Sequence, residues 1–126
     1  MSSAALTYLK QLRYLKSKAD RAEREVADID RRLSKSKDNA AALRRLQKDL
    51  RSWGKTYAET YKAIVNQINS LQAGSKTLLY REILSMRYID GLTMIQIADR
   101  LGYSDSYANS CHSRALRLFD DQFIKK

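Results

Sequence analysis

The sequence predicts an all-α protein, with a long helical hairpin in the first part of the chain and a smaller group of short helices in the last third. Three observations lead to this fold class. The 126 residues contain no proline and only four glycines, so little interrupts helices or forms hairpin turns. Two long stretches repeat apolar residues at helical spacing. A final stretch carries helix-capping residues at short intervals.

The first of these stretches carries a heptad repeat that runs without interruption from Ala5 to Leu33. Its apolar positions alternate spacings of three and four residues, and the positions beside them are mostly charged, as in a coiled coil. One such helix cannot bury its apolar stripe alone. The stripe consists of Ala5, Tyr8, Leu12, Leu15, Ala19, Ala22, Val26, Ile29 and Leu33.

The second stretch follows residues 34–39, where apolar residues are missing and a turn is expected. Asp38 or Asn39 can cap a helix that starts at Ala40. This helix is expected to kink or break near Gly54, because glycine adds backbone freedom in mid-helix. Its apolar stripe consists of Leu43, Leu46, Leu50, Trp53, Tyr57, Tyr61, Ile64, Ile68 and Leu71.

The short turn favours an antiparallel hairpin over residues 3–72, with one long helix that dimerises in parallel as the alternative. We expect the apolar stripes to pack both within the chain and between two chains, which makes a homodimer through the N-terminal helices. A glycine-containing linker at residues 73–76 is expected to separate the hairpin or coiled coil, residues 1–72, from a second domain at residues 77–126.

The last third of the chain predicts three helices, at about residues 77–88, 93–101 and 105–121, joined by tight turns. The second of them starts with a capping box, in which the hydroxyl of Thr93 and the side chain of Gln96 satisfy each other's backbone amides. This local signal fixes where the helix begins.

Gly102 and Ser104 define the turn before the third helix. Glycine ends a helix in the left-handed conformation at little cost, and serine caps the next helix. Two short helices joined in this way form a helix-turn-helix, which presents the N-terminal side chains of its second helix to the major groove of DNA. The inward positions of that helix are expected to be Ala108, Cys111, Ala115 and Leu118 or Phe119, and its exposed first turns carry Asp105, Ser106, Asn109, Ser110 and Ser113.

The charge balance favours a polyanionic partner. The chain carries 24 lysines and arginines against 14 aspartates and glutamates, a net charge of +10, which fits double-stranded DNA first and an anionic membrane second. Residues 1–72 hold 16 basic and 8 acidic side chains, and residues 73–126 hold 8 and 6. The N-terminal helices therefore either follow the phosphate backbone or carry charges that solvate a coiled coil.

Several function classes are not expected. No stretch has the roughly 18 to 20 apolar residues of a membrane span, and no signal sequence is recognisable, so we expect a cytoplasmic protein without membrane contact. Cys111 and His112 are the single cysteine and the single histidine, which leaves no ligand set for a structural metal site. As helix neighbours they do not face each other, so they cannot form a nucleophile and base pair. We expect no enzyme activity, no metal and no cofactor.

Residues 91–104, GLTMIQIADRLGYS, followed by Arg114-Ala115-Leu116, resemble region 4 of bacterial sigma factors, and the similarity extends over residues 77–120. The whole chain, with basic helices before one such module, resembles phage-encoded late transcriptional regulators of the ArpU, RinA and LtrC kind. This resemblance implies that the helix after Ser104 binds a promoter-proximal DNA element in the bacterial host cytoplasm. It also implies activation of phage late genes, in some cases through contact with RNA polymerase.

The resemblance further implies which residues contact DNA. The third helix lacks the arginine and glutamate that region 4 typically carries near its start, so the usual sigma promoter element is not the expected target. Asn109 can pair with adenine through two hydrogen bonds. The base-reading positions carried over are Asp105, Ser106, Tyr107, Asn109 and Ser110, with Arg100, Arg114 and Arg117 near phosphates. Thr93, Tyr103, Ser104 and Ser113 complete the expected DNA-binding set.

The chain is not a complete sigma factor, because a charged pair of helices stands where a promoter-melting segment would be needed. The function that the sequence favours is a sequence-specific DNA-binding regulator of transcription. Two alternatives stay open: a phage DNA-packaging adaptor of the small-terminase kind, and a structural coiled-coil protein whose C-terminal helices bind another protein.

Overall fold

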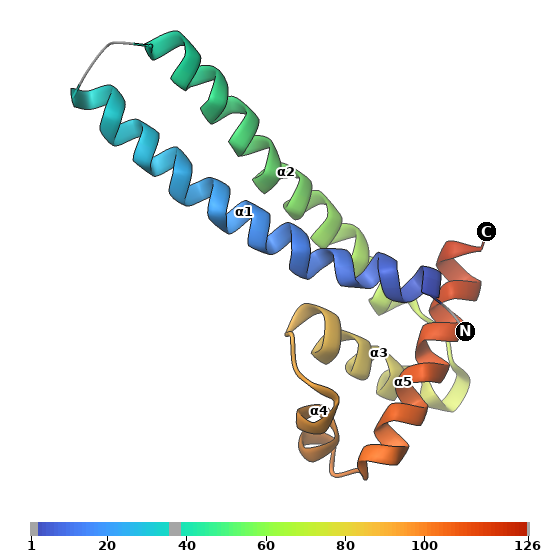
Figure 1. Ribbon diagram of the computed structural model, residues 1–126. Coiled ribbons are helices and arrows are strands. Elements are labelled where there is room, and N and C mark those ends of the chain that lie inside the picture. Colours follow the sequence, from blue (N-terminus) through green and yellow to red (C-terminus); the bar gives the residue numbers. More distant parts are fainter. Residues whose placement is uncertain (1–2, 36–38, 126) are drawn as a thin grey trace. The chain divides into compact units, whose positions relative to one another are not determined.

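A computed structural model describes residues 3–35 and 39–125 of the chain. The described residues are helical apart from short turns, and no strand occurs among them, which confirms the all-α prediction (Figure 1). None of the described helices is both long and apolar enough to cross a membrane. The elements are α1 (Ser3–Lys35), α2 (Ala40–Ser70), η1 (Gly74–Lys76), α3 (Thr77–Leu84), η2 (Ser85–Ile89), α4 (Met94–Leu101), α5 (Asp105–Phe119) and η3 (Asp120–Ile124).

The packing divides the chain into two compact units. The described residues of Tyr14–Tyr61 form one, the hairpin unit, and those of Met1–Arg13 and Lys62–Lys126 form the other, the composite unit. The expected linker at residues 73–76 does not coincide with this division, because it forms a turn and the 3-10 helix η1 inside the composite unit. The start of α1 and the end of α2 therefore belong with the C-terminal helices.

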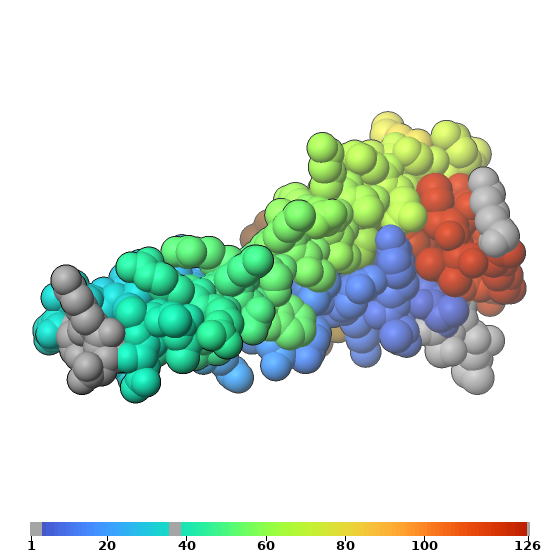
Figure 2. Space-filling model, turned by 90° about the horizontal axis from the view of Figure 1, so that it is seen from above, coloured from blue at the N-terminus to red at the C-terminus, as the bar shows by residue number. Residues whose placement is uncertain are grey.

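The hairpin unit consists of two antiparallel helical segments, which Figures 1 and 2 show side by side. Lys18 Nζ lies 5.5 Å from the ring centroid of Trp53. Further along the pair, Gln47 Nε2 donates to the backbone oxygen of Val26 at 3.2 Å and to Asp30 Oδ1 at 2.7 Å. Residue numbers thus rise along α1 as they fall along α2. The antiparallel hairpin is confirmed, and the alternative of one long helix is wrong.

The two apolar stripes of the hairpin unit are buried to different extents. On α1, Leu15, Ala22 and Ile29 are buried, as the heptad repeat predicts. On α2, Leu46 is 47% exposed and Tyr61 is 39% exposed, while the stripe residues between them are only half-buried. Within one chain, α2 therefore keeps part of its apolar stripe in contact with solvent.

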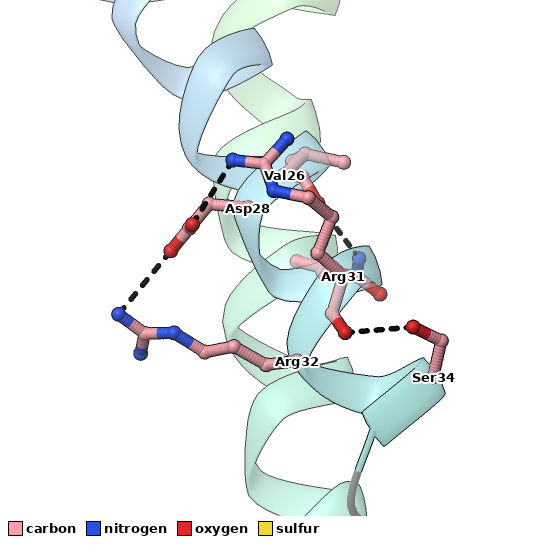
Figure 3. A network of polar contacts seen from close by, with 6 residues as sticks. Val26, Asp28, Arg31, Arg32 and Ser34 are labelled. Carbon is pink, nitrogen blue, oxygen red and sulfur yellow. Dashed lines mark hydrogen bonds and ion pairs between the residues drawn. The ribbon is translucent and has the colours of Figure 1, made fainter.

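The turn of the hairpin lies largely on residues 36–38, outside the described part, so capping by Asp38 cannot be described. Asn39 has a φ of 60°, and its backbone oxygen accepts from the amide of Leu43 at 2.9 Å, so α2 begins at Ala40 as predicted. Before the turn, Asp28 pairs with two arginines at i+3 and i+4, at 3.1 and 3.2 Å (Figure 3). Such exposed pairs contribute little stability but partly neutralise the basic charge there.

The predicted break at Gly54 is wrong, because α2 runs as one helix from Ala40 to Ser70. Gly54 is exposed, and a Cβ added there would meet no atom within 4 Å. The cost of one mid-helix glycine is only about 1 kcal/mol relative to alanine. Packing of the helix on both sides of Gly54 outweighs this cost.

The core of the composite unit gathers side chains from all its long elements. Leu9 of α1 is fully buried although it stands outside the heptad seam, because the start of α1 packs on the C-terminal helices as well as on α2. The hydroxyl of Tyr8 donates to Gln67 Oε1 at 2.7 Å, and its ring lies 6.0 Å from that of Phe119. The largest fully buried side chains are Leu9, Ile64, Ile68, Leu71, Ile83, Leu84, Ile97, Cys111 and Phe119.

Gly54 and Gly102 differ in backbone conformation, so replacing each by alanine should change the free energy of unfolding in opposite directions. We expect Gly54→Ala to raise the free energy of unfolding by about 0.5 to 1 kcal/mol, because alanine loses less backbone entropy in an exposed helix. Gly102, with a φ of 74°, lies in the left-handed region. We expect Gly102→Ala to lower the free energy of unfolding by about 1 to 2 kcal/mol. Urea unfolding followed by circular dichroism measures both, and a destabilised Gly54→Ala would contradict the regular helix described here.

Candidate nucleic-acid interface

The start of α4 is fixed by the predicted capping box. Thr93 has an extended backbone, with φ −76° and ψ 161°, and its hydroxyl accepts from the amide of Gln96 at 3.2 Å. The side chain of Gln96 accepts in turn from the amide of Thr93 at 2.9 Å. Two amides that the helix cannot satisfy itself are thereby paired, so α4 begins where the sequence predicted.

A Schellman motif ends α4. The amide of Tyr103 donates to the backbone oxygen of Ala98 at 2.9 Å, and that of Gly102 donates to Asp99 at 3.3 Å. The left-handed Gly102 makes this reversal possible without a steric penalty. Ser104 then caps α5, since its hydroxyl accepts from the amide of Tyr107 at 3.1 Å. Three residues thus connect α4 to α5.

The inward face of α5 is made mainly of small side chains from Ala108 to Ala115. Ala108, Cys111 and Ala115 are buried, which lets α5 approach α3 and α4 closely. Phe119 is fully buried and Leu118 is half-buried, so Phe119 is the core residue of the two that the sequence left open. Leu116 is also buried, although the helical repeat did not predict it.

The opposite face of α5 is polar and exposed. The five residues predicted for this face are all exposed, and each of them has another of the five three or four positions away along the helix. Tyr107 is half-buried at its edge, and its ring meets that of Tyr103 edge to face at 4.9 Å. Tyr103 is 41% exposed, so it lies on the surface rather than in the core. The exposed residues are Asp105, Ser106, Asn109, Ser110 and Ser113.

Asn109 is held by its own helix. Its Nδ2 donates to the backbone oxygen of Asp105 at 2.8 Å, which uses one of the two amide hydrogens. The second hydrogen and the Oδ1 acceptor remain for another partner. One donor and one acceptor on the same planar group are what a two-bond contact to the major-groove edge of adenine requires.

Residues 80–118 match the family model described as Sigma-70, region 4. The match runs from α3 to α5 and includes both helices of the helix-turn-helix. Comparison with curated proteins and with solved structures gave no match. The C-terminal helices of this chain form a sigma region-4-like helix-turn-helix, a DNA-binding type of domain.

The expected phosphate-contacting residues of the region-4-like domain are all exposed. Arg100 lies in the last turn of α4, and Thr93, another predicted DNA-binding residue, is exposed at the N-cap of the same helix. Arg114 and Arg117 lie on α5, beyond its exposed polar turns. Lys76 is not among the residues predicted from the sequence, and its Nζ donates to the hydroxyl of Tyr107 at 3.1 Å. No local signal marks this contact, because 31 residues separate its partners.

A contact between Tyr88 and His112 joins the middle of α5 to the residues after α3. The Tyr88 hydroxyl lies 2.6 Å from His112 Nε2, and the two rings stack at 5.6 Å. Burial raises the pKa of Tyr88 to about 12, and burial together with the Arg87 guanidinium lowers the pKa of His112 to about 4. Both groups are therefore neutral at neutral pH. The contact is a hydrogen bond between neutral groups that holds α5 in position, and it is not an ion pair.

Two arginines hold the turn that precedes α4. Arg13 Nη1 donates to the backbone oxygen of Gly91 at 3.2 Å, and Arg87 Nη1 donates to that of Leu92 at 2.8 Å. A Cβ on Gly91 would lie 3.1 Å from Arg13 Nη1, and the φ of 76° also favours glycine here. The start of α1 therefore helps to position the region-4-like domain.

The lowered pKa of His112 predicts acid sensitivity. Between pH 6.5 and about 4, unfolded His112 takes up a proton that the folded chain excludes, so the free energy of unfolding falls as the pH is lowered through this window. The slope from this group stays below about 1.4 kcal/mol per pH unit. Urea unfolding measured across this range tests the effect.

His112→Gln is the control for this prediction, because an amide can keep a hydrogen bond to Tyr88 without titrating. Carboxylates also titrate near the lower end of the range, so the difference between the two proteins is the quantity to compare. Equal pH dependence in the wild-type chain and the variant would show that His112 contributes nothing.

Proposed function

We propose that this protein regulates transcription by binding double-stranded DNA in a sequence-specific manner, with the first turns of α5 in the major groove. One observation carries the proposal. The helix that Ser104 caps buries its small side chains inward and leaves short polar side chains exposed on the opposite face. The major groove admits one α-helix, and short polar side chains allow its backbone to come close to the bases. The match to sigma-70 region 4 supports the same mode of binding.

The predicted residues take two roles in this proposal. Asn109 offers a donor and an acceptor to adenine, and Asp105 can accept from the amino group of cytosine. The phosphate contacts fix the position of the domain on the duplex and carry no sequence information. Contacts to DNA bases are assigned to Asp105, Ser106, Tyr107, Asn109, Ser110 and Ser113. Contacts to the sugar-phosphate backbone of DNA are assigned to Thr93, Arg100, Tyr103, Ser104, Arg114 and Arg117.

The regulated genes are the finer part of the proposal. Resemblance of the whole chain to phage-encoded late regulators makes activation of phage or prophage late genes the specific role that we propose. The base-facing side chains differ from those of typical region 4, so the operator is a different sequence from the usual sigma promoter element. We also propose that this protein contacts bacterial RNA polymerase, and the region-4-like domain supports this part of the proposal.

The hairpin unit is proposed to join two copies of the chain. Support comes from the apolar stripe of α2, which one chain leaves partly open: Leu46 is 47% exposed and Tyr61 is 39% exposed. On α1, Tyr14 is 58% exposed. Large apolar side chains aligned along one helix lower their free energy when a second helix covers them. A dimeric regulator would read two half-sites of a symmetric operator.

Selection from a randomised duplex pool, followed by sequencing of the bound fraction, tests sequence reading directly. We expect enrichment of one motif. On that motif, Asn109→Ala should weaken binding by about 1 to 3 kcal/mol, because the variant loses a contact to one base pair, and binding to random duplex should not change. Asn69→Ala, an exposed asparagine of α2, is the matched control and should bind like the wild type. Unchanged binding of Asn109→Ala to the selected motif would contradict the proposed reading face.

Light scattering after size exclusion tests the proposed dimer. We expect two copies for the wild-type chain and one for Leu46→Glu, because a charge at this exposed position is harmless in one chain but costly inside an interface. Leu78→Glu, at a residue of the composite unit that is 80% exposed, should stay dimeric. A monomeric wild type would contradict the dimer, and a large ring of subunits would favour a packaging adaptor over a regulator.

A further inference from the structure

A basic groove lies beside the second half of α5 in the composite unit. It has a volume of about 420 Å³, and we call it the Lys76 groove. Its residues come from three separate segments: the turn before α3, α3 itself, and the second half of α5. The groove is lined by Ala73, Lys76, Tyr80, Arg114, Arg117 and Leu118.

The charge of the Lys76 groove is uncompensated. Three of its six lining residues are cationic, and none is acidic. Among the described residues, no carboxylate lies within ion-pair distance of Lys76, Arg114 or Arg117. Cations that share a groove without a counter-ion repel each other, so a bound anion would lower the electrostatic energy of this surface.

Lys76 is tied to the helix that is proposed to read DNA. Its Nζ lies 3.1 Å from the hydroxyl of Tyr107 and 5.9 Å from the centroid of that ring. The same hydrogen bond raises the pKa of Lys76, which stays fully charged at neutral pH. Tyr107 itself lies in the first turn of α5, where its amide donates to Ser104. The cation is therefore positioned by the same turn that begins the reading face.

The spacing of residues on α5 places the groove along one edge of that face. Ser110, Arg114 and Arg117 follow each other at four and three residues, so they form one line along the helix. A helix that lies in the major groove has a sugar-phosphate backbone beside it. Arg114 and Arg117 of the Lys76 groove stand on that side of the helix, in line with exposed Ser110.

We infer that the Lys76 groove binds the sugar-phosphate backbone of the DNA strand that borders the major groove occupied by α5, with Lys76 as a phosphate contact. This inference rests on the proposed function. The groove is much larger than one phosphate group, and its apolar residues Ala73, Tyr80 and Leu118 offer a surface for deoxyribose. Both features fit a stretch of backbone better than a free phosphate ion. The segment at residues 73–76 thereby becomes part of the DNA interface.

The salt dependence of binding to random duplex DNA tests the inference. Each phosphate contact contributes about −0.9 to the slope of log binding constant against log salt concentration. We expect Lys76→Met to weaken binding to all duplex sequences and to reduce the magnitude of this slope by about 0.9. Lys62→Met makes the same exchange at an exposed lysine of α2 that does not line the groove, and should leave the slope unchanged. Arg117→Gln should act like Lys76→Met.

The outcomes separate this inference from the proposed function. If neither Lys76→Met nor Lys62→Met changes the salt slope while Asn109→Ala no longer binds the selected motif tightly, the groove assignment is wrong and sequence reading stands. If Lys76→Met reduces the slope while Asn109→Ala has no effect, the groove binds backbone and the reading face is wrong. An unchanged slope with weaker retention of Lys76→Met on polyglutamate resin would assign the groove to an acidic protein surface and overturn the inference. A wild-type chain that binds no duplex overturns both.

Discussion

Small side chains on the inward face of α5 allow this helix to lie close to α3 and α4. Ala108 and Ala115 are fully buried and Cys111 is almost so, which leaves no room for rotation of the helix about its own axis without opening a cavity. The orientation of the inward face also fixes the outward face. Every side chain that is proposed to meet a base therefore depends on this packing, although none of the packed atoms would touch DNA.

Helix caps and side-chain contacts hold the helix-turn-helix in this arrangement. The capping box at Thr93 and the cap at Ser104 fix where α4 and α5 begin, and the Tyr88–His112 contact fixes the middle of α5 against the residues after α3. Arg13 holds the turn before α4 from the start of α1. Residues of the first and second helices thus complete the core of the composite unit and support the turn before α4.

Two kinds of surface lie along α5. The polar face has short side chains with hydrogen-bonding groups, suited to base edges, and the Lys76 groove has long cationic side chains, suited to phosphates. Tyr107 connects the two, since it stands at the start of the polar face and accepts the hydrogen bond from Lys76. This link gives a physical route by which backbone binding and base reading would share one rigid element.

The sequence by itself determined that the chain is helical, where α4 begins and ends, where α5 begins, and which face of α5 points outward. These features depend on contacts between residues at most five positions apart, such as Thr93 with Gln96 and Ala98 with Tyr103, so a local pattern predicts them. Only the tertiary structure decided which residues close the core and which cations share a surface. Leu9 is buried outside its heptad seam, Lys76 reaches Tyr107 across 31 residues, and Tyr8 reaches Gln67 across 59. Such contacts depend on how helices pack, and no periodicity along the chain encodes that packing.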